Sequence, residues 1–378
     1  MQLTFPFPGS SPTDWMDRLF LLSLLLSLTQ LSSVLASTLG NVESTSIIQE
    51  DLSFRQVVPL DDDVDPLLNA DHHFSLFKKK YGKTYSTQEE DDYRFSVFKA
   101  NLHRAKRHQL LDPSAVHGIT KFSDLTPSEF QQRLHLGHHK QKRRLSVSAD
   151  PNEAPILPTR DLPSPGSALD YRQWGVVTPV KDQGSCRSSW AFSSTGALEA
   201  ANALASGDLV SLSEQQLVDC VHKDGSGCYG GRINSAFEYI QQQGGIDSEE
   251  SYPYEGEVGA CRFNSSIVAA MVRNFSVVSS DVNQVAANLV KNGPLAVALN
   301  ADWLLTYIGG VTCPLICLDS SEPRDDGALV VGYGGGSAGQ LNQYWIVKNS
   351  WGVNWGEEGY FRLGWGCTGC GDYYTVSA

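Results

Sequence analysis

The chain has 378 residues and a formal net charge of −13. That length allows one or two globular domains, and 41% hydrophobic with 10% aromatic residues is an ordinary globular composition. The negative charge argues against nucleic acids and anionic membranes as partners. Beyond Asp150 there are 24 acidic and 12 basic residues, so nearly all of the excess lies in the C-terminal part. We expect a monomer that needs neither a metal ion nor another cofactor.

Residues 1–36 contain a pattern typical of a secretory signal peptide. Arg18 precedes an apolar run that ends in small residues, and the run is too short and too rich in serine for a transmembrane helix. Met16 opens this pattern, so it is the alternative start of translation. A protein of the secretory pathway can keep disulfides. Two Asn-x-Ser triplets are then candidate glycosylation sites: Asn264 and Asn274.

The segment that follows is polar at first and then helical. Residues 37–69 are acidic and predict no packed structure. A helical pattern begins at His72. Six residues at steps of three and four predict one face of a helix: Glu90, Arg94, Phe98, Asn101, Ala105 and Gln109.

A short strand, a helix start and a linker are expected next. Gly118, Phe122 and Asp124 fall at even steps, as in a strand, and residues 126–129 form a capping box. Residues 135–155, "HLGHHKQKRRLSVSADPNEAP", are basic, then polar, then proline-bearing. Their histidine spacing matches no metal-ligand set. They predict an exposed linker, the kind of segment that processing proteases cut.

The larger C-terminal part begins helical and ends in strands. Helices are expected over 189–205, from a capping box at Ser211 to Glu214, over 233–245 and over 281–292. The stretches "PLAVALN", "GALVVGYGG", "QYWIVKNS" and "GYFRLG" predict strands between glycine-rich turns. A helical half followed by a sheet half predicts an α+β protein with two lobes and a cleft between them.

Four motifs in this order resemble the papain-like cysteine proteases: "PVKDQGSC..SWAFS", "LSEQQLVDC", "GCYGG" and "YWIVKNSWGVNWGEEGY". The helix pattern E-x3-R-x3-F-x2-N-x3-A-x3-Q is similar to the cathepsin F-like branch, and its plant, drought-responsive vacuolar members in particular. The resemblance implies a propeptide over 37–156, with an inhibitor-like helical domain over about 72–130 in the cleft. It implies a mature domain over 157–378, with a helical left lobe and a β-barrel-like right lobe. A vacuolar, lysosomal or extracellular location follows.

The resemblance also assigns roles to single residues. Gln183 occupies the oxyanion position and Asn349 the position that orients the catalytic histidine, with Trp351 shielding it. Ser189 stands where the family has its nucleophilic cysteine, and Asp326 stands where it has its histidine. The substrate cleft would include a further set: Arg187, Gly230, Gly231 and Trp351.

Ser189 and Asp326 form a poor catalytic pair. A serine hydroxyl needs a base, and a carboxylate with a reference pKa of about 3.9 accepts an alcohol proton poorly. Loss of a catalytic unit costs about six powers of ten in turnover. The only histidine after Asp150 is His222, far from this motif. We therefore favour a helix-capping role for Ser189, and without its histidine partner Asn349 more readily occupies a turn.

Arg187 replaces the glycine that the family has next to the disulfide cysteine. Its side chain would obstruct the cleft by turning toward Asp325 or Asp326, or it would point into solvent.

Eight cysteines allow full pairing, in 105 ways. The resemblance implies three bridges: Cys186–Cys228, Cys220–Cys261 and Cys317–Cys370. The fourth, Cys313–Cys367, is the pair that remains. A zinc site at Cys367 and Cys370 is a weaker alternative in an oxidising compartment.

We therefore expect a protease homologue without peptidase activity, which binds peptides, protease inhibitors or related proteases. Two alternatives stay open. The chain is an active cysteine-type endopeptidase if the substitutions are sequence errors, or it is a decaying duplicate without a role.

Overall fold

The structure is a computed structural model that describes residues 67, 69–134, 152–158, 167–222, 227–314, 326–335, 343–367 and 374–378. The expected signal peptide and most of the expected linker lie outside these residues. Within the described ranges, no helix is sufficiently long and apolar to cross a bilayer.

The N-terminal part is built on one long helix. The face of that helix predicted from the sequence packs against the segment that follows it in the chain. The elements are α2 (Ala70–Tyr81), α3 (Gln88–Leu111), β1 (Ala115–His117) and α4 (Pro127–Leu134). The buried Asn101 of α3 donates from Nδ2 to the carbonyl oxygens of Ser123 and Leu125, at 2.8 Å each. The expected strand over 118–124 is wrong, because Thr120 and Ser123 bond to each other and close a turn there.

The helices of the C-terminal part follow the sequence pattern with one correction. They are α5 (Ser189–Ser206), α6 (Glu214–Cys220), α7 (Ile233–Gln243) and α8 (Val282–Asn292). The side chain that caps α6 is that of Ser213, which accepts from the backbone N–H of Gln216. The expected capping box from Ser211 to Glu214 is therefore wrong, because the Glu214 carboxylate contacts Lys181 instead.

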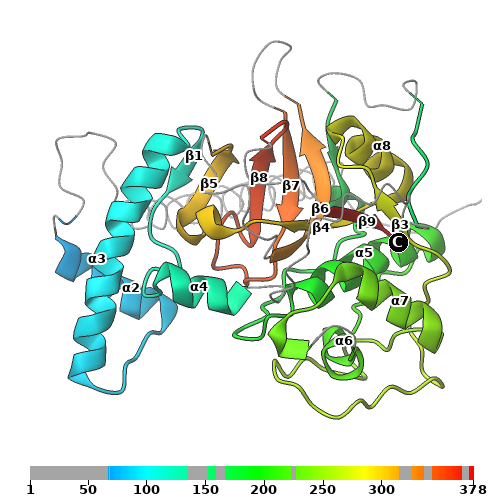
Figure 1. Cartoon of the computed structure of the whole chain (residues 1–378), viewed down its shortest axis with the longest axis horizontal. Helices are drawn as coiled ribbons and strands as arrows, with labels where there is room; N and C mark the ends of the chain where they lie inside the picture. Colours follow the sequence, from blue (N-terminus) through cyan, green and yellow to red (C-terminus); the bar gives the residue numbers. More distant parts are fainter. Residues whose placement is uncertain are drawn as a thin grey trace, which may run out of the picture. The chain divides into compact units, whose positions relative to one another are not determined.

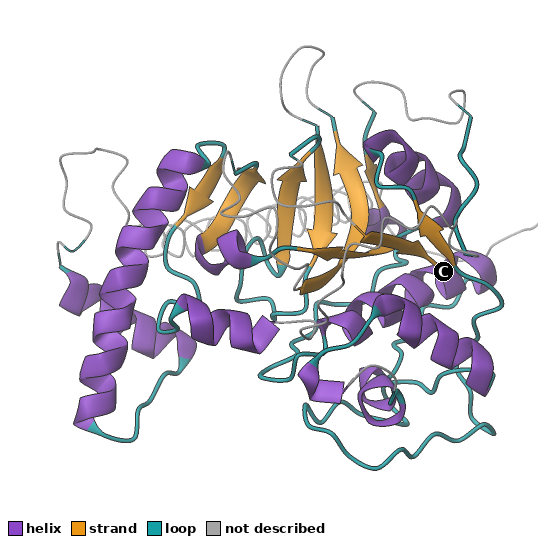
Figure 2. Ribbon diagram, viewed as in Figure 1, coloured by secondary structure: helices purple, strands orange, loops and turns teal. Residues whose placement is uncertain are grey.

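The strands form one nine-stranded sheet in the order β1-β5-β8-β7-β6-β4-β9-β3, with β2 beside β6. The bounds are β2 (Leu169–Asp170), β3 (Ser276–Val278), β4 (Leu295–Leu299), β5 (Tyr307–Thr312), β6 (Asp326–Gly334), β7 (Tyr344–Lys348), β8 (Tyr360–Gly364) and β9 (Tyr374–Ser377). Figure 1 shows α5, α6 and α7 grouped beside these strands, and Figure 2 shows helices on either side of them. The α+β, papain-like prediction is confirmed, but the sheet is open rather than a closed barrel.

The central strands are apolar on both faces because each face borders a different core. In β6, Ala328 and Val330 belong to one core, and Leu329 and Val331 belong to the other. Strands β4 and β7 alternate in the same way. The first core includes Phe122 of the N-terminal part, so the two parts share one apolar interior.

Three disulfides are present in the described residues: Cys186–Cys228, Cys220–Cys261 and Cys313–Cys367. The third is the pair obtained by elimination, and it removes Cys367 from any zinc site. The expected Cys317–Cys370 bridge lies outside the described residues.

Replacing Asn101 by alanine should lower the free energy of unfolding by about 2–4 kcal/mol, because two buried carbonyl oxygens lose their donor. Denaturant unfolding of the full chain, followed by tryptophan fluorescence, measures this change. The control is Ser96→Ala on the exposed side of α3, which should change stability little. Equal stabilities of the two variants would contradict the role assigned to Asn101.

Candidate active site

Ser189 is the first residue of α5 and is fully buried. Its Oγ accepts a hydrogen bond from the backbone N–H of Gly327 at 3.0 Å. A Cβ on Gly327 would lie 2.7 Å from the Ser189 carbonyl oxygen, so β6 can approach α5 only with glycine here. The expected capping role is wrong, because Ser188 is the N-cap residue and Ser189 bonds to the sheet instead.

Asp326 is the first residue of β6, where it pairs with Leu299 of β4. Its side chain is fully buried, and neither carboxylate oxygen has a hydrogen-bond partner among the described residues. Burial raises the pKa of Asp326 to about 7, and the nearby Ser189 and Asn349 side chains offset only part of that rise. In acidic solution this group is therefore a neutral carboxylic acid.

Asn349 and Gln183 are both buried and are linked through Ser350. The Oδ1 of Asn349 accepts from the Ser350 N–H at 2.8 Å, as in a local turn, while its Nδ2 has no partner in the described part of the chain. The Ser350 hydroxyl donates to Gln183 Oε1 at 2.7 Å. The Nε2 of Gln183 donates to the Cys186 carbonyl at 2.9 Å, which fixes the amide.

The structure thus brings together the four residues expected in the site, but the set contains no imidazole. The hydroxyl of Ser189 faces a carboxyl group that is uncharged at acidic pH and cannot accept a proton there. His222 is exposed and follows α6, away from the described contacts of this set. Between α5 and β6 the described residues thus place a hydroxyl and a carboxyl group, and neither a thiol nor an imidazole.

The N-terminal part covers Trp351, which is buried beside the site. The rings of Phe122 and Phe130 meet the Trp351 ring edge to face, with centroids 5.3 and 5.6 Å away. Lys121 adds two polar contacts, one to the Trp351 carbonyl at 2.7 Å and one to the Asp182 carboxylate at 2.6 Å. The N-terminal part therefore lies across the side of the site that Trp351 borders.

A second contact of the pro-segment was not expected from the sequence. The buried Asp112 accepts from the Thr312 hydroxyl at 2.5 Å and from the Cys313 N–H at 2.9 Å. His117 lies 3.2 Å from the same carboxylate, and its other ring nitrogen lies 2.9 Å from the Thr306 hydroxyl. Single polar residues in a helix end and a short strand give no periodic signal, so the sequence could not reveal this cluster.

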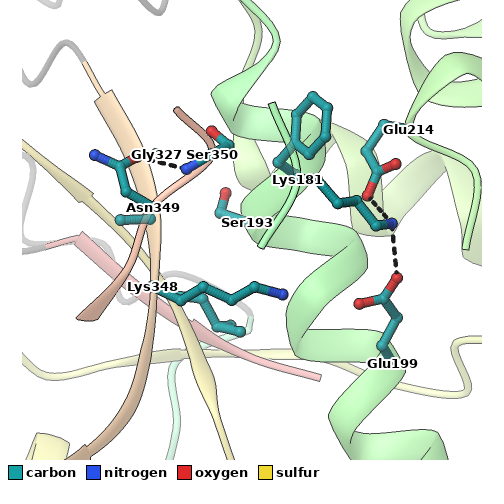
Figure 3. Close-up of a pocket in the computed structure, with 11 residues that line it drawn as sticks. Lys181, Ser193, Glu199, Glu214, Gly327, Lys348, Asn349 and Ser350 are labelled. Atoms are coloured by element: carbon teal, nitrogen blue, oxygen red, sulfur yellow. Dashed lines mark hydrogen bonds and ion pairs between the residues drawn. The ribbon is translucent and has the colours of Figure 1, made fainter. Parts of the chain in front are cut away.

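A buried charge cluster between α5, α6 and β7 also escaped the sequence pattern (Figure 3). Lys181 contacts the carboxylates of Glu199 at 3.0 Å and Glu214 at 2.6 Å, and Lys348 donates to Thr178 at 2.9 Å. Burial raises the pKa of Glu214 and lowers that of Lys348 to about 8. The two lysines and the two glutamates line a cavity of about 20 Å³, which has room for about one water molecule.

The remaining cleft residues lie beside the Cys186–Cys228 bridge. Arg187 is half-buried, and the carboxylate oxygens of Asp326 have no partner, so the expected pairing of these two is wrong. Asp325 lies outside the described residues. Gly230 has a φ of 101°, and a Cβ on Gly231 would lie 2.5 Å from the Trp190 ring, so both positions require glycine.

Replacing Asp326 by asparagine should stabilise the protein more at pH 8 than at pH 5. The folded-state pKa lies above the unfolded value, so the folded state binds more protons between about pH 4 and 7 and loses stability as pH rises through that window. Asparagine removes the buried charge, a gain on the order of 1–3 kcal/mol at pH 8. Thermal unfolding at both pH values measures it. The exposed Asp208→Asn is the control, and a gain that does not grow with pH would refute the buried, unpaired carboxylate.

Comparisons with known proteins agree with this geometry. Residues 165–377 match the papain family cysteine protease model, and residues 74–130 match the cathepsin propeptide inhibitor domain. "Cysteine proteinase 15A" of Pisum sativum is 52% identical over 96% of this chain and 98% of its own length. "Probable cysteine protease RD19C" of Arabidopsis thaliana is 52% identical over 92% and 93%. The digestive procathepsin L 3 of Tenebrio molitor is similar in structure, with a TM-score of 0.70 and 35% identity over 82% of this chain and 99% of that one. The chain belongs to the papain family of cysteine proteases and carries a cathepsin-type inhibitory pro-segment.

Proposed function

We propose that this papain-family member has lost peptidase activity and binds peptides or proteins in its cleft. One observation supports the proposal: a buried serine begins α5 and a buried carboxyl group begins β6, at the two positions that the sequence resemblance assigns to the family's cysteine and histidine. The hydroxyl is already bonded to the sheet, and the carboxyl group is neutral in acid. The Trp351 ring is buried beside them, and the Gln183 amide is fixed by its hydrogen bond to the Cys186 carbonyl.

The proposed maturation follows from the same loss. The signal peptide would end at residue 36 and the propeptide at residue 156, and the mature domain would act in a vacuole, a lysosome or the extracellular space. Asn264 and Asn274 are both exposed, which supports glycosylation at either triplet. Because the chain cannot cut its own linker, a related active protease would have to release the mature domain.

Names of the relatives favour a second candidate, an active cysteine-type endopeptidase whose key residues are misread in this sequence. Resequencing of the transcript separates the two. A cysteine codon at position 189 and a histidine codon at position 326 would replace the first proposal by the second.

The processed protein should hydrolyse peptide substrates no faster than the Ser189→Ala variant, because neither a thiolate nor an imidazole is present. An epoxide that alkylates catalytic thiols should leave it unlabelled. The double variant Ser189→Cys/Asp326→His serves as the positive control for both assays. Hydrolysis that disappears in Ser189→Ala, or stoichiometric labelling in the cleft, would overturn the proposal.

Expressed in a host without related proteases, the full chain should keep its pro-segment at acidic pH. Addition of an active papain-family protease should then cut it within the linker that contains Lys140 to Arg144. Gel electrophoresis with N-terminal sequencing follows the reaction. Conversion without added protease, at a rate that rises with protein concentration and is lost in Ser189→Ala, would contradict this expectation.

A further inference from the structure

An open pocket of about 340 Å³ lies where the pro-segment meets the cleft beside the Cys186–Cys228 bridge. Its lining from the pro-segment includes Glu129 and Arg133 of α4. Its lining from the mature domain includes Ser185, Arg187, Cys228 and Tyr229. Tyr229 is 73% exposed, so the pocket can be entered from solution on that side.

The uncompensated charge of this pocket is positive. Glu129 is neutralised by Arg94, whose Nη1 lies 2.9 Å from the carboxylate. Arg133 and Arg187 have no carboxylate within ion-pair distance among the residues that the structure describes. When the pro-segment is removed, Arg187 stays as the cation of the cleft wall, with the neutral Ser185 and Tyr229 beside it.

The position of Arg187 is fixed by its neighbours. It follows Cys186 directly, and that cysteine is bridged to Cys228. The backbone N–H of Arg187 also donates to the Cys228 carbonyl oxygen at 3.4 Å. A half-buried guanidinium on such a backbone loses less conformational freedom when it binds a carboxylate than one on a mobile loop.

We propose that the mature-domain wall of this pocket, centred on Arg187, is a subsite for a single acidic side chain, Asp or Glu, of a peptide or protein that binds in the cleft once the pro-segment has left. The inference rests on the proposed peptide-binding function and names the residue class that the cleft selects. Arginine matches a carboxylate in charge and in its paired N–H donors. The glycine that the family has at this position could not supply that contact.

The chain's own linker is a poor occupant of this subsite. Residues 135–149 of the linker contain four Lys or Arg residues and no carboxylate, so this part of the linker would be repelled by Arg187. Residues 157–378 carry 23 acidic and 12 basic residues, which disfavours a long acidic tract in the ligand. Salt, however, screens charges that lie more than a Debye length of about 8 Å apart, so a single carboxylate interacts mainly with its nearest cation. The favoured ligand therefore carries one isolated acidic residue.

The test of the subsite is the binding of paired peptides to the protein after an added protease has cut the linker of the full chain and the released pro-segment has been separated from it. The probes are fluorescein-labelled octapeptides of neutral sequence with Glu or Gln fixed at each position in turn. At one position the Glu peptide should bind about tenfold more tightly than its Gln partner, and high salt should reduce that ratio. Arg187→Gln should bring the ratio to within about twofold, because the Glu peptide loses its cationic partner.

Arg273→Gln, an exposed arginine outside the pocket, is the matched control and should keep the preference for Glu. Peptides that bind wild type with no preference for Glu at any position would overturn the subsite and leave the proposed function intact. A preference for Glu that persists in Arg187→Gln would also overturn the subsite and leave the proposed function intact. Failure of every peptide to bind the cut protein would overturn the proposed function, and the subsite with it.

Discussion

The close approach of α5 to β6 is the constraint on which the rest of the site depends. Because Gly327 has no side chain, the backbone of β6 comes near enough to the start of α5 for its N–H to reach Ser189 Oγ. That contact sets the distance between the helical half and the sheet half. It also buries Asp326, the residue before Gly327, where water cannot solvate a charge. Backbone packing thus sets the burial that raises the pKa of Asp326.

The pro-segment is attached to the mature domain by two different kinds of contact. Near the cleft the contact is aromatic, with two phenylalanine rings on Trp351. Near β5 it is polar, with Asp112 bonded to Thr312 and to the backbone of Cys313. The aromatic contact depends on the exclusion of water from apolar surface, and the polar contact depends on the charge of Asp112. The two contacts therefore respond differently to salt and pH.

The sequence predicted the parts of this fold that have a period or a motif. The face of α3 that carries Asn101, the capped helix α8 and the apolar central strands all follow from spacing. The turn at 118–124 was misassigned because Thr120 and Ser123 bond locally, and even spacing of three residues cannot reveal that. The charge cluster around Lys181 was missed because its members come from separate segments that only the tertiary fold brings together.

Strand β6 has a consequence that extends beyond the site. Its alternate side chains belong to the two different cores, so neither core is complete without it. Excision of the helical half as an independent fragment would leave Leu329 and Val331 behind and open its interior to water. Each half therefore depends on β6 for a closed interior, so sequence changes at the catalytic positions leave the requirement for the whole two-core body in place.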